Sequence, residues 1–111
     1  MLVILLKNII SLYIYIMTFI ETLKKEIGEK RKLRPSSINA YVSNLNKLHK
    51  LMFDEDEIKE LDFLKDKKGV MKTIEDKKLS TRKTYLAAIV VALMAFDKDE
   101  KLINYYRDEM E

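Results

Sequence analysis

The stretch RPSSINAYVSNLNKLHKL, residues 34–51, carries short hydrogen-bonding side chains beside a basic residue. Its polar members of interest are Arg34, Ser36, Ser37, Asn39, Ser43 and Asn44. Hydroxyl and amide groups of this kind donate to phosphate oxygens or reach base edges, and arginine adds a charge-assisted donor. The alternative is a local role, in which Ser36 and Ser37 only satisfy the free N–H groups of a helix's first turn. The pattern therefore raises anion binding as a hypothesis.

A second group of polar and basic residues lies in KLSTRKT, residues 78–84. It consists of Lys78, Ser80, Arg82, Lys83 and Thr84. Both groups fall in or beside basic blocks: residues 24–34 have six basic and two acidic side chains, and residues 67–83 have seven and two. Residues 54–66 have seven acidic and two basic side chains, and residues 97–111 have six and three. The formal net charge of only +3 hides this segregation, although lysine runs also occur as merely solvated faces.

Helical periodicity predicts the elements that position these groups. Thr18 and Glu21 form a capping box for a first helix that is expected to end near Gly28. A second helix is expected from Pro35 to just before the acidic run at 54–57. Its predicted buried stripe is Ile38, Tyr41, Val42, Leu45, Leu48 and Met52.

Three further helices follow in the second half of the chain. Asp62 or Asp66 is expected to cap a short helix that carries Val70, Met71 and Ile74 and that Gly69 weakens. Ser80 is expected to cap a longer helix, residues 81–96, whose surface is apolar nearly all round, so it should be the central helix. A last helix is expected to begin near Asp99.

Composition is consistent with one small all-α domain. The chain has 111 residues, 48% of them hydrophobic, with two Gly, one Pro and no Cys. These values predict a small antiparallel bundle of four to five helices over residues 17–111. In such an up-down bundle the second and fourth helices run in the same direction, so we expect their two basic starts on one end. The absence of Cys excludes thiolate metal sites and fits an intracellular, reducing compartment.

The first segment, residues 1–16, is strongly apolar and leaves three interpretations open. Met17 is the true start and the segment comes from an upstream start codon, or residues 1–20 form a membrane anchor, or the segment is an extra helix on the core. A signal peptide fits poorly, because no basic residues precede the apolar run and no small-x-small cleavage site follows it.

Two motifs together resemble one known domain. LRPSSINAYVSNLNKL, residues 33–48, resembles the L-S-P-x-T-x-x-x-Y-x-x-x-L-x-x-L opening of the core-binding domain in tyrosine recombinases, the phage-integrase family. The matching residues are Leu33, Pro35, Ser37, Tyr41, Leu45 and Leu48. LSTRKTYLAAIVVALMAF, residues 79–96, is similar to the last main helix of that domain, with Ser80, Thr84, Ala88 and Ile89 aligned. Arg34 replaces the family's capping serine, so Ser36 or Ser37 must compensate.

The resemblance covers residues 18–96 and implies a SAM-like core-binding fold. It also implies binding of double-stranded DNA during DNA integration or recombination, with a recombinase catalytic domain or other protomers as further partners. The expected DNA contacts are the two polar groups above. The alternative function is a helical protein-interaction module that residues 1–20 tether to a membrane.

Catalysis is not expected from this chain. Recombinases of this family use Arg, Lys, His-x-x-Arg, a second His or Trp and a nucleophilic Tyr, whereas the single histidine here, His49, is followed by Lys50, Leu51 and Met52. One histidine and no cysteine make no metal cluster, so His49 is expected to be a partly exposed helix residue. The acidic run at 54–57 lacks the spacing of a calcium loop. Tyr41, Tyr85 and Tyr106 are expected in the core and Tyr105 on the surface, and no cofactor is expected.

Overall fold

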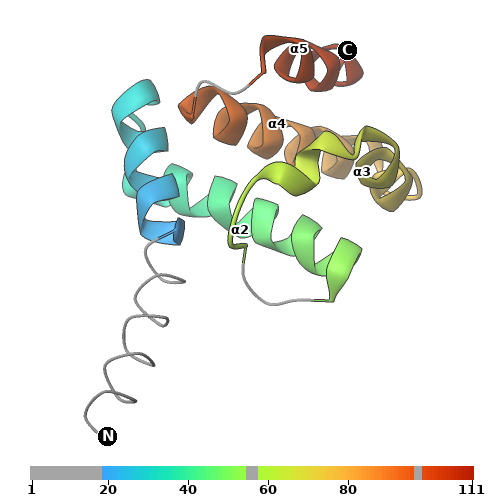
Figure 1. Ribbon diagram of the computed structural model, residues 1–111, viewed down its shortest axis with the longest axis horizontal. Coiled ribbons are helices and arrows are strands. Elements are labelled where there is room, and N and C mark those ends of the chain that lie inside the picture. The colour runs from blue at the N-terminus through green and yellow to red at the C-terminus, as the bar shows by residue number, and fades with distance from the viewer. Residues whose placement is uncertain (1–18, 55–57, 97–98) are drawn as a thin grey trace, which may run out of the picture.

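The computed structural model describes residues 19–54, 58–96 and 99–111. Within these ranges the chain is helical and has no strand. Helical segment 19–31 is followed by α2 (Pro35–Phe53), the 3₁₀ turn η1 (Asp62–Lys65), α3 (Lys67–Ile74), α4 (Leu79–Ala95) and α5 (Glu100–Glu109). α4 lies between α2 and α5 (Figure 1). The predicted fold class, a small all-α helical bundle, is confirmed, whereas the predictions for residues 1–16 and for Thr18 lie outside the described residues.

Helical segment 19–31 continues beyond Gly28, where the sequence predicted its end. Gly28 does not adopt a positive φ; Lys32 does, at 49°, and its N–H donates to the carbonyl of Gly28 at 2.8 Å. Gly28 instead permits close packing, since a Cβ there would lie 3.2 Å from Cδ1 of Ile38. Leu23 and Ile27 bury the inner face of the segment.

α2 begins and ends where the sequence predicts. Pro35 starts it, because the fixed φ of proline suits a first helical turn. Asp54 ends it with a φ of 57°, and its N–H donates to the Lys50 carbonyl at 2.7 Å. The predicted stripe faces the core: Val42, Leu45 and Leu48 are buried, and Ile38, Tyr41 and Met52 are partly buried against them.

The predicted N-cap compensation in α2 is wrong. Arg34 is the N-cap residue and makes no side-chain capping hydrogen bond. Ser36 and Ser37 lie inside the first turn, and neither hydroxyl bonds to another described residue. Neither serine therefore caps the start of α2.

His49 is buried, which corrects the predicted partial exposure. Its side chain is 8% exposed and its ring centroid lies 4.9 Å from that of Phe63 and 5.0 Å from that of Phe53. His49 is four residues after Leu45 and thus continues the buried stripe of α2. The 3₁₀ turn η1 brings Phe63 over it, and no local pattern in α2 reveals that contact.

Asp66 caps α3, and it was one of the two caps that the sequence predicted. Its Oδ1 accepts from the Gly69 N–H at 3.1 Å. Gly69 leaves room for this capping carboxylate, since a Cβ at this position would lie only 2.2 Å from Oδ2 of Asp66. Val70 and Ile74 are buried and hold α3 on the core.

α4 is the most buried helix, as predicted. Its buried residues are Leu86, Ala88, Ile89, Val90, Val91, Ala92, Leu93 and Ala95. The predicted cap is wrong, because the helix starts at Leu79 with Lys78 as N-cap and Ser80 lies inside the first turn. The carbonyl of Ser80 accepts the Thr84 hydroxyl at 2.9 Å.

α5 begins at Glu100, capped by Asp99, whose Oδ1 accepts the Lys101 N–H at 2.9 Å. Tyr106 fixes the helix to the core: its side chain is fully buried and its hydroxyl donates to the Leu64 carbonyl at 2.5 Å. Tyr105 is half-buried rather than exposed, with Lys67 Nζ 4.7 Å from its ring centroid. The prediction that Tyr106 is a core residue is confirmed, and Tyr41 and Tyr85 are half-buried beside that core.

α2 and α4 run in opposite directions (Figure 1). After α2 the chain first turns back, since the Ile58 N–H donates to Oδ1 of Asn46 within that helix at 3.3 Å. The η1 turn and α3 then bring it to the end of α2, where Lys77 lines a groove with Leu51 and Asp54. α4 therefore starts beside the end of α2 and runs back along it. The predicted parallel pair, with both basic helix starts on one end, is wrong.

Candidate functional site

The first groove of interest lies between helical segment 19–31 and α2. Its volume is about 440 Å³, and it is lined by Ile20, Lys24, Asn39, Val42, Ser43, Asn46, Lys47 and Lys50. Asn39, Ser43, Lys47 and Lys50 follow one another at intervals of four, four and three residues, which places them on one helical face. We call this the α2 groove.

Local packing fixes the groove wall. Val42 and Leu45 turn toward the core and so leave Asn39, Ser43 and Lys47 exposed. The Oδ1 of Asn46 accepts the backbone N–H of Ile58 at 3.3 Å, so the segment that follows α2 is tied to this helix. Ile58 is fully buried, which makes the tie part of the folded core.

A second groove continues from the first at the end of α2. Its volume is about 590 Å³, and it is lined by Lys47, Lys50, Leu51, Asp54, Lys77 and Tyr85. It exists because the start of α4 lies beside the end of α2. We call it the α2–α4 groove; it shares Lys47 and Lys50 with the α2 groove.

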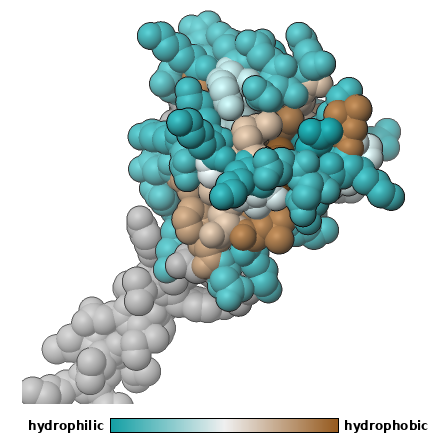
Figure 2. All heavy atoms as spheres, turned by 90° about the vertical axis from the view of Figure 1, so that its right-hand side faces the viewer, coloured by the Kyte–Doolittle hydropathy of each residue, from teal (hydrophilic) through white to brown (hydrophobic). Residues whose placement is uncertain are grey.

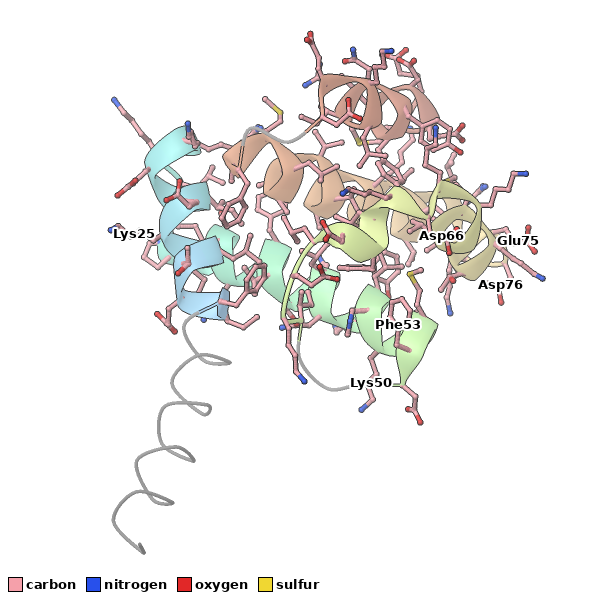
Figure 3. All side chains as sticks on the ribbon, in the orientation of Figure 1. Lys25, Lys50, Phe53, Asp66, Glu75 and Asp76 are labelled. Carbon is pink, nitrogen blue, oxygen red and sulfur yellow. The ribbon has the colours of Figure 1, made fainter. Side chains whose placement is uncertain are left out.

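The two grooves together carry a row of lysines, which we call the lysine strip: Lys24, Lys47, Lys50 and Lys77. Among the described residues, no carboxylate forms an ion pair with Lys24, Lys47 or Lys77. Like charges gathered in this way repel one another, and an anion bound between them relieves that repulsion. Figure 3 shows the side chain of Lys50, which lines both grooves, directed away from the bundle.

Of the six DNA contacts predicted around α2, two line the α2 groove and four do not. Asn39 and Ser43 line the α2 groove. Arg34 and Ser36 are exposed at the start of α2, with Ser37 half-buried beside them, and Asn44 is half-buried. None of these four lines the α2 groove.

The five DNA contacts predicted around α4 also do not share one surface. Lys78, Ser80, Lys83 and Thr84 are exposed at the start of the helix, and the Thr84 hydroxyl is already engaged with Ser80. Arg82 is half-buried and points elsewhere, into a third groove of about 480 Å³ lined by Lys68, Met71, Lys72, Glu75 and Tyr105. The start of α2 and the start of α4 therefore form separate surfaces.

Sequence reasoning missed the residues that connect the site. These are Lys24, Asn46, Lys47, Lys50 and Lys77. The regular spacing from Asn39 to Lys50 was a signal for the α2 part. No signal existed for Lys24 or Lys77, because their place depends on how segment 19–31 and α4 pack on α2.

The chain matches no protein-family model, and neither the curated proteins nor the solved structures include one significantly similar to it. Function must therefore be argued from the residues themselves.

Other site chemistry finds little support in the part of the chain that the structure describes. Across residues 19–54, 58–96 and 99–111, no three His, Asp or Glu side chains are placed to share a metal ion. Over the same ranges, no helix has both the length and the apolar character needed to cross a membrane. Burial, and then the neighbouring charges of Tyr105 and Asp66, raise the pKa of Tyr106, which disfavours the phenolate form that a tyrosine nucleophile requires.

Proposed function

We propose that this domain binds double-stranded DNA through phosphate contacts along the lysine strip, with Asn39 and Ser43 as neighbouring hydrogen-bond donors. The observation that carries the proposal is that Lys24 and Lys47 line one groove and Lys47 and Lys77 line the next, while none of the three forms an ion pair with a carboxylate among the described residues. Ammonium groups in a row beside short polar side chains suit a backbone of regularly spaced phosphates.

The resemblance to recombinase core-binding domains supports the same proposal and extends it. In that reading the domain holds one side of a duplex during integration or recombination, and another domain or protein supplies the catalytic residues. The lysine strip then takes the place expected of the starts of α2 and α4, and Arg34, Lys78 and Lys83 become outlying contacts. Incubation of the full chain with duplex DNA should give no covalent protein–DNA adduct.

Two adjacent lysines provide a matched test of the contact surface. Lys24 lines the α2 groove, whereas Lys25 is exposed and points away from the bundle (Figure 3). Each phosphate contact contributes about 0.9 to the slope of log affinity against log salt, which amounts to roughly eightfold in affinity at about 0.1 M salt. Lys24→Ala should therefore weaken duplex binding by roughly five- to tenfold, and Lys25→Ala by less than about twofold.

Fluorescence anisotropy with a labelled duplex of about 20 base pairs, repeated over a range of salt concentrations, measures both quantities. Lys47→Ala should behave as Lys24→Ala does, because both lysines line the α2 groove. Equal losses from Lys24→Ala and Lys25→Ala would show that only general positive charge matters. Absence of binding by the parent at low salt would remove the proposal altogether.

A further inference from the structure

The end of α2 and the start of α4 carry large apolar side chains that the fold leaves outside its core. Leu51 is 50% exposed, Phe53 48% and Leu79 59%. These are three of the four exposed large hydrophobic residues among those described, so the apolar exposure is concentrated rather than scattered. Figure 2, which faces this side of the molecule, shows apolar patches interrupting the hydrophilic surface.

Leu51 is the member of this group that lies in a hollow. It lines the α2–α4 groove together with the half-buried Tyr85. Lys47, Lys50 and Lys77 line the same groove, and among the described residues that line it Asp54 is the one acidic residue. The groove thus combines an apolar surface with three cations.

This combination selects among possible occupants. A phosphate backbone would use the lysines but would leave Leu51 and the ring of Tyr85 in contact with water. An amphipathic helix buries apolar side chains spaced three or four residues apart in such a groove, and acidic residues on its flanks complement the lysines. A second copy that presented this same groove would bring its own three lysines to it, where like charges oppose association.

We propose that the α2–α4 groove binds an acidic amphipathic helix of a partner protein, with Leu51 as the apolar anchor and Lys77 as a charge that orients the helix. The proposal does not rest on DNA binding. It has one consequence for DNA binding, however, because Lys47 and Lys50 belong to both grooves. Lys77 also belongs both to the α2–α4 groove and to the lysine strip, so a helix seated in this groove and a duplex on the strip would compete for all three lysines.

The test uses the full chain and a synthetic peptide of about 18 residues, with leucines at intervals of three and four on one face and glutamates on the flanks. Isothermal titration calorimetry gives the affinity of the parent and of three variants. Leu51→Ser should weaken peptide binding by about tenfold or more, as loss of an anchor residue does. Lys77→Glu should weaken it by a similar factor, with the effect decreasing at high salt.

Leu79→Ser is the matched control, because Leu79 is exposed at the same end but does not line the groove. It should change the affinity by less than about twofold. The same peptide with lysines in place of the glutamates should bind about tenfold more weakly or worse. Circular dichroism of each variant checks that the fold is retained, as expected for a half-exposed side chain.

Four outcomes would overturn the proposal. The first is a parent chain that does not bind the acidic peptide, and the second is an equal loss from Leu51→Ser and Leu79→Ser. The third is sedimentation showing that the parent dimerises and that Leu51→Ser makes it monomeric, which would assign the groove to a second copy. The last is a Leu51→Ser variant that loses duplex binding as strongly as peptide binding, which would assign the groove to DNA. Loss of duplex binding by Lys24→Ala alone bears on the proposed function and leaves this proposal standing.

Discussion

Removing the hydroxyl of Tyr106 should destabilise the fold by about 1–3 kcal/mol. The Tyr106 hydroxyl donates to the carbonyl of Leu64, and both residues are fully buried. Tyr106→Phe keeps the ring and leaves a buried carbonyl without that donor, a loss that costs about 1–3 kcal/mol. For a domain of this size, about 1 kcal/mol lowers Tm by roughly 4 °C, so the melting temperature should fall by roughly 4–12 °C.

Urea unfolding followed by circular dichroism measures this change in the free energy of unfolding. Tyr105→Phe is the matched control, because Tyr105 is half-buried, keeps its ring over Lys67 in the variant and donates no hydrogen bond to a described residue. Its effect should stay within about 0.5 kcal/mol. Equal free energies of unfolding for the two variants would refute the reasoning that the Tyr106–Leu64 bond fixes α5 to the turn η1.

The remaining stability predictions concern the same core and its caps. Burial raises the pKa of Tyr106, so above about pH 10 the unfolded chain loses the phenol proton while the folded state keeps it. The free energy of unfolding should therefore fall above about pH 10, and it should fall less in Tyr106→Phe. Gly69→Ala should destabilise the parent, because the new Cβ displaces the capping carboxylate of Asp66. In an Asp66→Ala background the same substitution should stabilise the fold by about 0.5–1 kcal/mol. A change in the free energy of unfolding that has the same sign in both backgrounds would contradict this reasoning. Ile89→Ala, at a fully buried position, should cost about 2–5 kcal/mol in urea unfolding, while Leu79→Ala at an exposed one should cost under about 0.5 kcal/mol.

Local features of this fold could be predicted because local chemistry determines them. Pro35 starts α2 through its fixed φ, and Asp66 and Asp99 cap α3 and α5 with their own carboxylates. The apolar character of α4 on nearly every face indicated a central helix, since no polar stripe was left for solvent. Each of these predictions needs only residues within a few positions of one another.

Features that depend on distant residues could not be predicted. The direction of α4 depends on how the chain between α2 and α4 folds back along α2, and it decides which basic residues lie together. The spacing of His49 from Leu45 places it on the buried stripe of α2, but the contact of its ring with Phe63 from the turn η1 depends on the tertiary fold. Lys24 and Lys77 belong to the candidate site because of how segment 19–31 and the start of α4 pack on α2, and their neighbours in sequence do not indicate this position. The polar face of α2 was therefore recognisable, but its cationic partners were not.

The central claim is that the lysine strip contacts duplex DNA, and amide chemical-shift mapping tests it most directly. The ¹⁵N-labelled full chain would be titrated at low salt with a duplex of about 20 base pairs. The account predicts the largest shifts at Lys24, Ser43, Lys47 and Lys77, which reverse as salt is added. Shifts confined to the acidic helix α5, or no shifts at all, would contradict it.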